Sequence, residues 1–186
     1  MVENTLNYMR LGGMFDHIGL GFHRYSTDNR WFLPHFEKML YDQAMISMAY
    51  LEAYQITGNK KYADVAEEIF TYVLRDMLDE KGGFYSAEDA DSEGEEGKYY
   101  VYSFEEIKDF PKIEKYFEIK PEGNWENKII LVEKEKPTAE IINKLIQIRL
   151  KRKKPFFDDK TQLDLNCLMI SALISSNEIL PKKGYL

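Results

Sequence analysis

The sequence predicts a mainly α-helical fold built from helical hairpins, with one small β-hairpin excursion. Apolar residues recur at steps of three and four over residues 36–57, and again over residues 61–79. Only Gly58 and Asn59 separate these two segments. Because so short a connection leaves the second helix beside the first, an antiparallel helical hairpin is expected. Further segments with a helical period lie in the last third of the chain.

The N-terminal elements are a helix and a long loop. Residues 2–10 are typical of the end of a helix, and Gly12-Gly13 provides its stop. Residues 12–34 are rich in glycine, aromatic and polar side chains, which indicates an ordered loop leading into the helix over residues 36–57.

An aromatic and acidic excursion follows the first hairpin. Phe84–Ser86 and Lys98–Tyr102 are short aromatic segments on either side of an acidic loop, so a small β-hairpin or an extended excursion is expected. Ser103 and Glu106 then have the spacing of a capping box, which predicts a short helix over residues 104–109.

The remaining chain is predicted to be irregular first and helical afterwards. Another short helix is expected after Pro111, and residues 119–136 are irregular with a possible strand at 129–132. Pro137-Thr138 opens a helix that reaches about residue 153, and a last helix covers about 162–177. The length of 186 residues favours a single domain over residues 1–186.

Composition excludes several classes of function. The net charge of -7 argues against nucleic-acid binding, which draws on clustered cations. The one basic cluster, Arg149 with Lys151–Lys154, is interpreted as a solvated helix end. No apolar run approaches the ~18 residues of a membrane span, and the first residues lack the layout of a secretory signal. No membrane association and a cytoplasmic location are therefore expected.

The single cysteine offers no internal disulfide. Cys167 lies in the apolar run LNCLMISALI, where a buried thiol is expected. Gly19-Leu20-Gly21 resembles part of a dinucleotide fingerprint, but Arg24 occupies the third position and no strand precedes it. No Gly-Lys-Ser/Thr follows either, so no cofactor is predicted.

Candidate functional residues concentrate in Gly21–Ala44. A protein interior has little use for so many charged and imidazole groups, since each must be hydrated, paired or hydrogen-bonded. Histidines 17, 23 and 35 allow three interpretations: general acid–base chemistry beside carboxylates, anchoring of the loop, or zinc ligation. No His-Glu-x-x-His pattern supports zinc, so no metal site is predicted.

The acidic loop over residues 88–96 is the second candidate. Asp89, Asp91 and Glu93 match the first positions of an EF-hand, but Tyr100 stands where the bidentate glutamate is required. The EF-hand is therefore rejected. A solvated loop and an active-site carboxylate from Glu88, Asp89 or Asp91 both stay open, and the aromatic flanks would suit stacking on a sugar ring.

Taken together, GGMFDHIGLGFHRYSTDNRWFLPHFEKMLYDQA and GGFYSAEDADSEGEEGKYYVY, and more weakly PEGNW and DDKTQLDLNCLMISAL, carry a family resemblance. The sequence resembles thioredoxin-domain-containing proteins of the spermatogenesis-associated type. These have an N-terminal thioredoxin-like domain and an (α/α) six-hairpin toroid similar to those of N-acylglucosamine 2-epimerase, cellobiose 2-epimerase and several glycoside hydrolases. The resemblance implies that residues 1–186 form part of the toroid, its first part, without the thioredoxin-like domain and the later hairpins.

Two functions follow from the resemblance. The first is a fragment of a carbohydrate-active domain, of sugar epimerase or glycosidase type, with a carbohydrate ligand. Its candidate catalytic residues are His23, His35, Asp42, Asp89 and Asp91. Its candidate substrate-binding residues are Arg24, Tyr25, Arg30, Trp31, Glu37, Tyr41, Tyr85 and Glu88. The alternative is a non-catalytic binding or scaffold module, or a truncated gene product, that self-associates or pairs with a separately encoded remainder.

Overall fold

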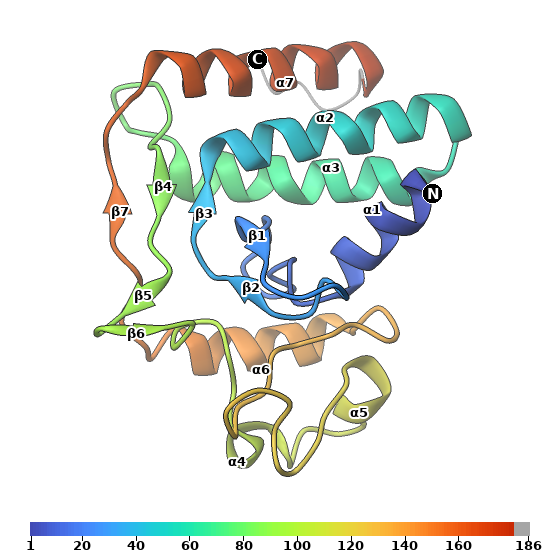
Figure 1. Cartoon of the computed structure of the whole chain (residues 1–186), viewed down its shortest axis with the longest axis vertical. Coiled ribbons are helices and arrows are strands. Elements are labelled where there is room, and N and C mark those ends of the chain that lie inside the picture. Colours follow the sequence, from blue (N-terminus) through green and yellow to red (C-terminus); the bar gives the residue numbers. More distant parts are fainter. Residues whose placement is uncertain (181–186) are drawn as a thin grey trace.

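The computed structural model describes residues 1–180, and this part of the chain is mainly helical with small antiparallel sheets (Figure 1). Its helices are α1 (Val2–Leu11), α2 (Leu40–Thr57), α3 (Lys60–Tyr72), α4 (Phe104–Ile107), α5 (Ile113–Tyr116), α6 (Ala139–Arg149) and α7 (Leu163–Ile179). A π-helical turn, η1 (Val73–Met77), extends α3. The strands are β1 (Tyr25–Ser26), β2 (Pro34–His35), β3 (Lys38–Met39), β4 (Ala87–Glu88), β5 (Asp91–Ser92), β6 (Glu95–Glu96) and β7 (Phe157–Asp158).

The predicted helical hairpin is confirmed as α2 and α3. Gly58 ends α2 in the left-handed conformation, with φ of 68°, which glycine adopts without steric cost. The side chain of Asn59 then caps α3 by accepting a hydrogen bond from the backbone N–H of Lys61. Helix α7 packs against α2 on the side away from α3, so that the three helices form one layer (Figure 1).

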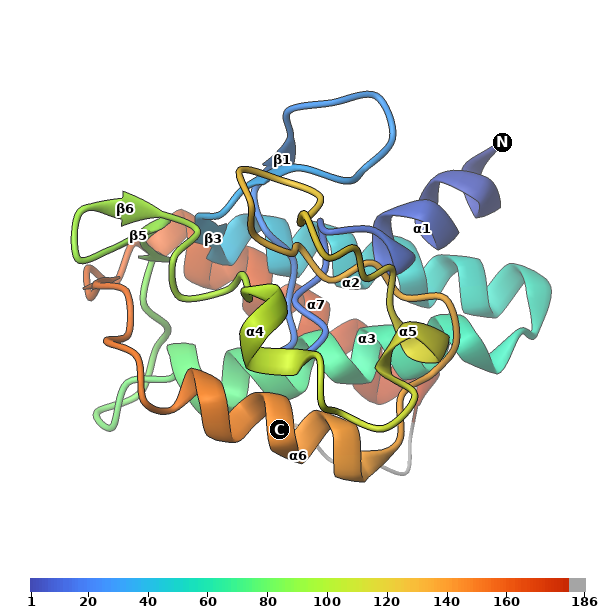
Figure 2. The same ribbon diagram turned by 90° about the horizontal axis from the view of Figure 1, so that it is seen from below.

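One apolar core lies between α2, α3 and α7, and a second packs against α6. Thr138 caps this helix, as expected from the sequence, and the buried side chains Tyr102, Phe117, Ile129 and Leu145 pack between α6, α4, α5 and the irregular segment 117–136. The predicted capping box of Ser103 and Glu106 is confirmed at the start of α4. The loop between α1 and β3 lies between α6 and the layer of α2, α3 and α7 (Figures 1 and 2).

The predicted start of the helix at residue 36 is wrong, because residues 36–39 are extended. Strand β3 pairs with β4, placing Lys38 opposite Glu88, and β4 pairs with β7. Phe36 and Lys38 are almost fully buried while Glu37 between them is partly exposed. This alternation has the period of a strand, and the helix begins only at Leu40.

The predicted β-hairpin lies elsewhere in the excursion. Phe84–Ser86 and Lys98–Tyr102 do not pair with one another: Phe84 bridges to Leu78, and Tyr102 bridges to Ile129. The hairpin is instead formed by β5 and β6 within the acidic loop. Glu93 and Gly94 both have positive φ, 56° and 78°, as a tight two-residue hairpin turn requires.

The expectation of a buried thiol at Cys167 is wrong, because the thiol is exposed. Helix α7 buries Asn166, Met169, Ala172, Leu173 and Ser176 against α2, and Cys167 lies on the opposite face. The apolar run around it covers both faces, so composition alone did not distinguish them. Within residues 1–180 the structure has no helix that is long and apolar enough to span a membrane.

Candidate functional site

The extended segment 36–39 separates two groups of polar side chains. Successive side chains of an extended chain point to opposite sides, so Glu37 and Lys38 face different groups. The first group, here named the outer cluster, is partly exposed and consists of Arg24, Tyr25, His35, Glu37, Tyr41, Asp42 and Glu96. The second lines a pocket that opens to solvent near Arg75 and Lys154, here named the inner cavity, and its inner members are Asp16, Lys38, Tyr72, Glu88, Tyr100 and Arg149.

Strand pairing positions one half of the outer cluster. The β1–β2 ladder places Tyr25 opposite His35, and their rings stack with centroids 5.0 Å apart. The imidazole Nδ1 lies 2.7 Å from Glu96 Oε1, and Nε2 lies 3.7 Å from Glu37 Oε2. His35 is thus held between two carboxylates, one of which comes from the acidic loop.

Arg24 connects Glu37 to the start of α2. Its Nη1 donates to Glu37 Oε2 at 2.8 Å, and its Nε donates to the Tyr41 hydroxyl at 3.0 Å. Glu37 therefore contacts both a guanidinium and an imidazole, which fixes the orientation of both groups.

Asp42, in the first turn of α2, is the most perturbed acid of the outer cluster. Burial raises the pKa of its carboxyl group to about 7, the charge of Arg24 opposes this shift, and the charge of Glu37 adds to it. Its Oδ2 is buried and has no hydrogen-bond partner within residues 1–180. A carboxyl group of this kind holds a proton near neutral pH and can give or take one.

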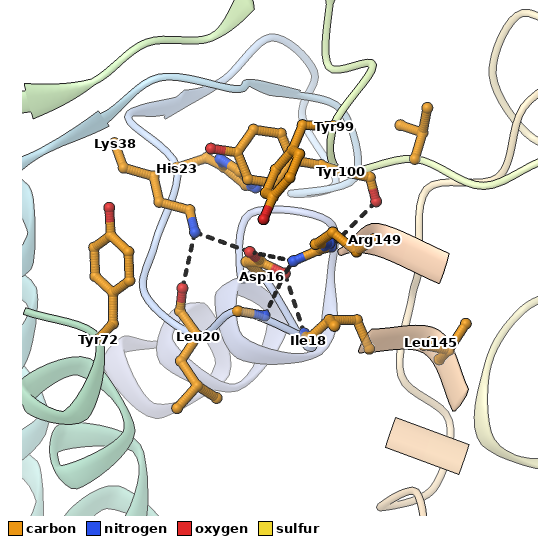
Figure 3. A network of polar contacts seen from close by, with 12 residues as sticks. Asp16, Ile18, Leu20, His23, Lys38, Tyr72, Tyr99, Tyr100, Leu145 and Arg149 are labelled. Atoms are coloured by element: carbon orange, nitrogen blue, oxygen red, sulfur yellow. Dashed lines mark hydrogen bonds and ion pairs between the residues drawn. The ribbon is translucent and has the colours of Figure 1, made fainter. Parts of the chain in front are cut away.

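Asp16 is the centre of the inner network (Figure 3). Its two carboxylate oxygens accept from Arg149 Nη1 at 2.7 and 2.8 Å, and Oδ2 also accepts from Lys38 Nζ at 2.9 Å. The backbone N–H groups of Ile18 and Gly19 donate to Oδ1. Gly19 is required here, because a Cβ at this position would lie 2.6 Å from Asp16 Oδ2.

The charges of the inner network keep one another ionised despite burial. Burial alone would raise the pKa of Asp16, but Arg149 and Lys38 hold it well below its ordinary value. Burial alone would lower the pKa of Arg149, but the same carboxylate raises it. Burial and the charge of Lys38 lower the pKa of the neighbouring His23 to about 3, so this imidazole is neutral at physiological pH.

The inner cavity has a volume of about 300 Å³. Lys38 Nζ lies 4.4 Å from the centre of the Tyr72 ring, and it also donates to the carbonyl of Leu20. The Tyr72 hydroxyl donates to Glu88 Oε2 at 2.7 Å. The Tyr100 hydroxyl is buried and makes no hydrogen bond of regular geometry within residues 1–180, although Glu88 lies close to it. Burial, and after it the nearby charge of Glu88, raises the pKa of this hydroxyl.

The structure brings six of the predicted site residues together in the outer cluster: Arg24, Tyr25, His35, Glu37, Tyr41 and Asp42. Two others, His23 and Glu88, lie on the side of the inner cavity. His23 donates through Nδ1 to the carbonyl of Phe36 at 2.8 Å, and its ring packs edge-on against Tyr100. This is the anchoring geometry that the sequence had left open.

The other predicted site residues lie outside both groups. Asp89 and Asp91 are exposed, and Asp89 Oδ1 accepts from the Asp91 N–H within the loop. Arg30 and Trp31 belong to a loop that Asp28 closes by accepting from the backbone N–H of Arg30. Tyr85 packs near Phe157 of β7.

The interpretation of the basic cluster as a solvated helix end is wrong for its first member. Arg149 is buried because Asp16, 133 positions earlier in the chain, accepts its hydrogen bonds. Arg152 is also engaged, with the carbonyl of Tyr99 at 3.0 Å and with Glu106. Lys151 and Lys153 are exposed, as expected of a solvated end.

Sequence reasoning missed Asp16, Lys38, Tyr72, Tyr100 and Arg149 as members of a site. Two signals were present. Lys38 is the first lysine of the chain, and the residues before it include arginine but no lysine, so this position stands out. Asp16 also lies three residues before Gly19, a spacing typical of a carboxylate that accepts from nearby backbone N–H groups. Neither signal identifies the partner.

The three histidines do not converge on one point. His17 Nε2 lies 3.1 Å from the carbonyl of Gly12, His23 contacts the carbonyl of Phe36, and His35 contacts Glu96. Within residues 1–180, no group of three or more histidine, cysteine, aspartate and glutamate side chains is arranged to hold a metal ion.

The structure is that of a mainly helical protein with a partly exposed cluster of charged, imidazole and phenol side chains beside a buried ion network. The chain is homologous to part of spermatogenesis-associated protein 20. It is 55% identical to the Mus musculus protein and 53% identical to the Homo sapiens protein, each over 113 residues. Each match covers 58% of this chain and 14% of the relative.

A more distant relative extends the match. An uncharacterized protein of Caenorhabditis elegans is 37% identical over 145 residues, which cover 67% of this chain and 20% of that protein. No protein-family model matches the chain. The chain therefore spans about one seventh to one fifth of the length of these relatives.

Proposed function

We propose that residues 1–186 form part of a carbohydrate-active (α/α) toroid domain and that the outer cluster is part of its active site. Homology to part of a much longer protein supports a partial domain. The α2–α3 hairpin with α7 packed beside it supports a domain built from helical hairpins. The carbohydrate assignment also draws on the family resemblance of the two long motifs.

The observation that carries this proposal is Asp42. Its carboxyl group has a pKa of about 7, an oxygen without a partner in the described chain, and the charges of Arg24 and Glu37 nearby. His35 adds a second group able to transfer protons, and the stacked Tyr25 ring offers an aromatic face for a sugar ring. Arg24 would hold sugar oxygens once a substrate competes with Glu37.

Two reaction types follow, and each assigns Asp42 a role. In an epimerase, Asp42 or His35 removes the proton on the sugar carbon and the other group returns one to the opposite face. In a hydrolase, protonated Asp42 donates its proton to the glycosidic oxygen as the bond to the anomeric carbon breaks. A carboxylate such as Glu37 takes a proton from a water molecule whose oxygen bonds to that carbon. His23 is not suited to either role, because it is buried and neutral and donates to Phe36.

Product analysis tests both reaction types. The chain and the full-length mouse relative are each incubated with a panel of disaccharides in D₂O. An isomer carrying deuterium at the epimerised carbon indicates epimerisation, and free monosaccharide indicates hydrolysis. Asp42→Asn is expected to reduce the rate by about 100-fold or more. Asp109→Asn, a change of the same kind at an exposed position, is the matched control. If neither protein forms either product, the proposal is rejected.

A second candidate, a binding or scaffold module, is favoured by one face of α7. Leu163, Ile170 and Ile174 are exposed to 81%, 45% and 45%, and Cys167 lies between them on the same face. Their spacing of three, four and seven residues forms a continuous apolar stripe. Self-association, or pairing with a separately encoded remainder of the domain, would cover this stripe.

Sedimentation measurements test the scaffold candidate. The unchanged chain is expected to form oligomers in a concentration-dependent way, and Ile170→Glu is expected to return it to a monomer. Glu178→Gln on the same helix is the control and should leave the oligomers unchanged. A monodisperse monomer at every concentration would contradict self-association.

A further inference from the structure

The inner cavity contains a polar atom that the described chain leaves unsatisfied. The Tyr100 side chain is buried, with 5% of its surface exposed, and its hydroxyl has no hydrogen-bond partner within residues 1–180. A buried hydroxyl without a partner is unfavourable, and native structures rarely retain one without a reason. The atom lines a cavity of about 300 Å³, which is at the lower end of the range for small-molecule sites.

The groups around Tyr100 provide both donors and acceptors. Lys38 and Glu88 are paired across the β3–β4 ladder, yet the lysine Nζ turns to Asp16, and it forms no ion pair with Glu88 in the described structure. Glu88 Oε2 accepts from Tyr72, and its carboxylate also borders the cavity. The cavity therefore offers an ammonium donor, a carboxylate acceptor and a hydroxyl that can act as either.

The innermost charges of the cavity are balanced, because Lys38 and Arg149 are matched by Asp16 and Glu88, so a neutral ligand suits this part of it. Arg75, Asp76 and Lys154 bring the formal charge of the whole lining to +1. At the mouth, Asp76 accepts from Arg75 and lies 3.7 Å from Lys154. The rings of Tyr72, Tyr99 and Tyr100 also line the cavity, and Lys38 Nζ and the Arg149 guanidinium lie over faces of these rings. Alternating donors and acceptors beside aromatic rings suit a ring that bears several hydroxyl groups.

We propose that the inner cavity binds one small, neutral, polyhydroxylated ring, of the size of a single sugar or cyclitol. One ligand hydroxyl bridges Lys38 and Glu88, accepting from the first and donating to the second, and another hydrogen-bonds to the Tyr100 hydroxyl. This site lies on the other side of segment 36–39 from the outer cluster. It is inferred from the groups that line it and does not require the outer cluster to be catalytic.

Tyr100→Phe is the discriminating variant, because it removes an oxygen that makes no hydrogen bond of regular geometry within residues 1–180. The substitution is expected to leave the melting temperature of the free chain unchanged or higher. Binding of myo-inositol and D-glucose to the full chain is measured by saturation-transfer NMR titration. Tyr100→Phe is expected to weaken their binding by about fivefold, the effect of losing one hydrogen bond. Tyr54→Phe on α2, which does not line the cavity, is the matched control.

Four outcomes would overturn the proposal. The first is that neither polyol binds, and the second is that sodium acetate, an anionic probe, binds while the polyols do not. The third is that Tyr100→Phe binds the polyols as the unchanged chain does. A loss of polyol binding in Asp42→Asn without a loss in Tyr100→Phe would place the ligand in the outer cluster and would also overturn it. Failure of the disaccharide assays with polyol binding retained would reject the catalytic proposal alone.

Discussion

Replacing Asp16 by asparagine is expected to be among the most destabilising single changes in the chain. Asp16 is 5% exposed, and it is the shared ion-pair partner of Lys38 and Arg149, both of which are buried to a similar extent. An asparagine at this position would retain the shape of the side chain but leave two neighbouring buried cations without their anion. Removing one partner of a buried pair costs about 3–5 kcal/mol.

The loss is measured by urea denaturation and by the melting temperature. For a chain of this length, 3 kcal/mol corresponds to a decrease of about 6–12 °C. Lys38→Met is expected to be less harmful, because it leaves Asp16 paired with Arg149 alone. In the double variant, Lys38→Met should recover part of the loss caused by Asp16→Asn, with a coupling energy of about 0.5–3 kcal/mol. A loss below about 1 kcal/mol in Asp16→Asn, or strictly additive effects, would refute the reasoning.

Three further outcomes follow from individual residues. Gly19→Ala should lower the free energy of unfolding by about 1–3 kcal/mol, because its Cβ would meet Asp16 Oδ2; urea denaturation checks this. Burial would raise the pKa of Glu133, but His17 and Arg10 lower it to about 2. The contribution of Glu133 to stability should therefore be present above pH 4.5 and be lost as the pH falls towards 2. In acid denaturation, Glu133→Gln should not show this loss of stability between pH 4.5 and 2. Burial raises the pKa of Asp42, so stability should decrease as the pH rises from about 4 to 7, and Asp42→Asn should remove this slope in denaturation at several pH values.

Local patterns predicted the helices well. The hairpin of α2 and α3, the cap of α6 at Thr138 and the capping box before α4 depend on residues a few positions apart, and the sequence displays them directly. The sequence does not reveal the extended segment before α2, because Phe36 precedes Met39 and Leu40 by three and four positions and so fits a helical period. Only the partner strand β4, 50 residues later, decides that they are extended.

The two groups of polar residues differed in how far the sequence predicted them. Most of the outer cluster lies within residues 24–42, so one stretch already contains its members. The acidic loop also contributes, but through Glu96 beside His35 and not through the predicted Glu88, Asp89 or Asp91. The inner network joins Asp16 to Arg149 across 133 positions. No local pattern relates these two residues, and Arg149 was assigned to solvent because its neighbours in sequence are exposed lysines.

The titration of Asp42 tests the central claim most directly. The ¹³C signal of its carboxyl group is followed by NMR from pH 3 to pH 9, with and without a disaccharide that is converted or bound. A midpoint of about 7 that moves when the sugar is added is expected. A midpoint near the ordinary value of 3.8, unaffected by every sugar tested, would contradict an acid–base role for the outer cluster.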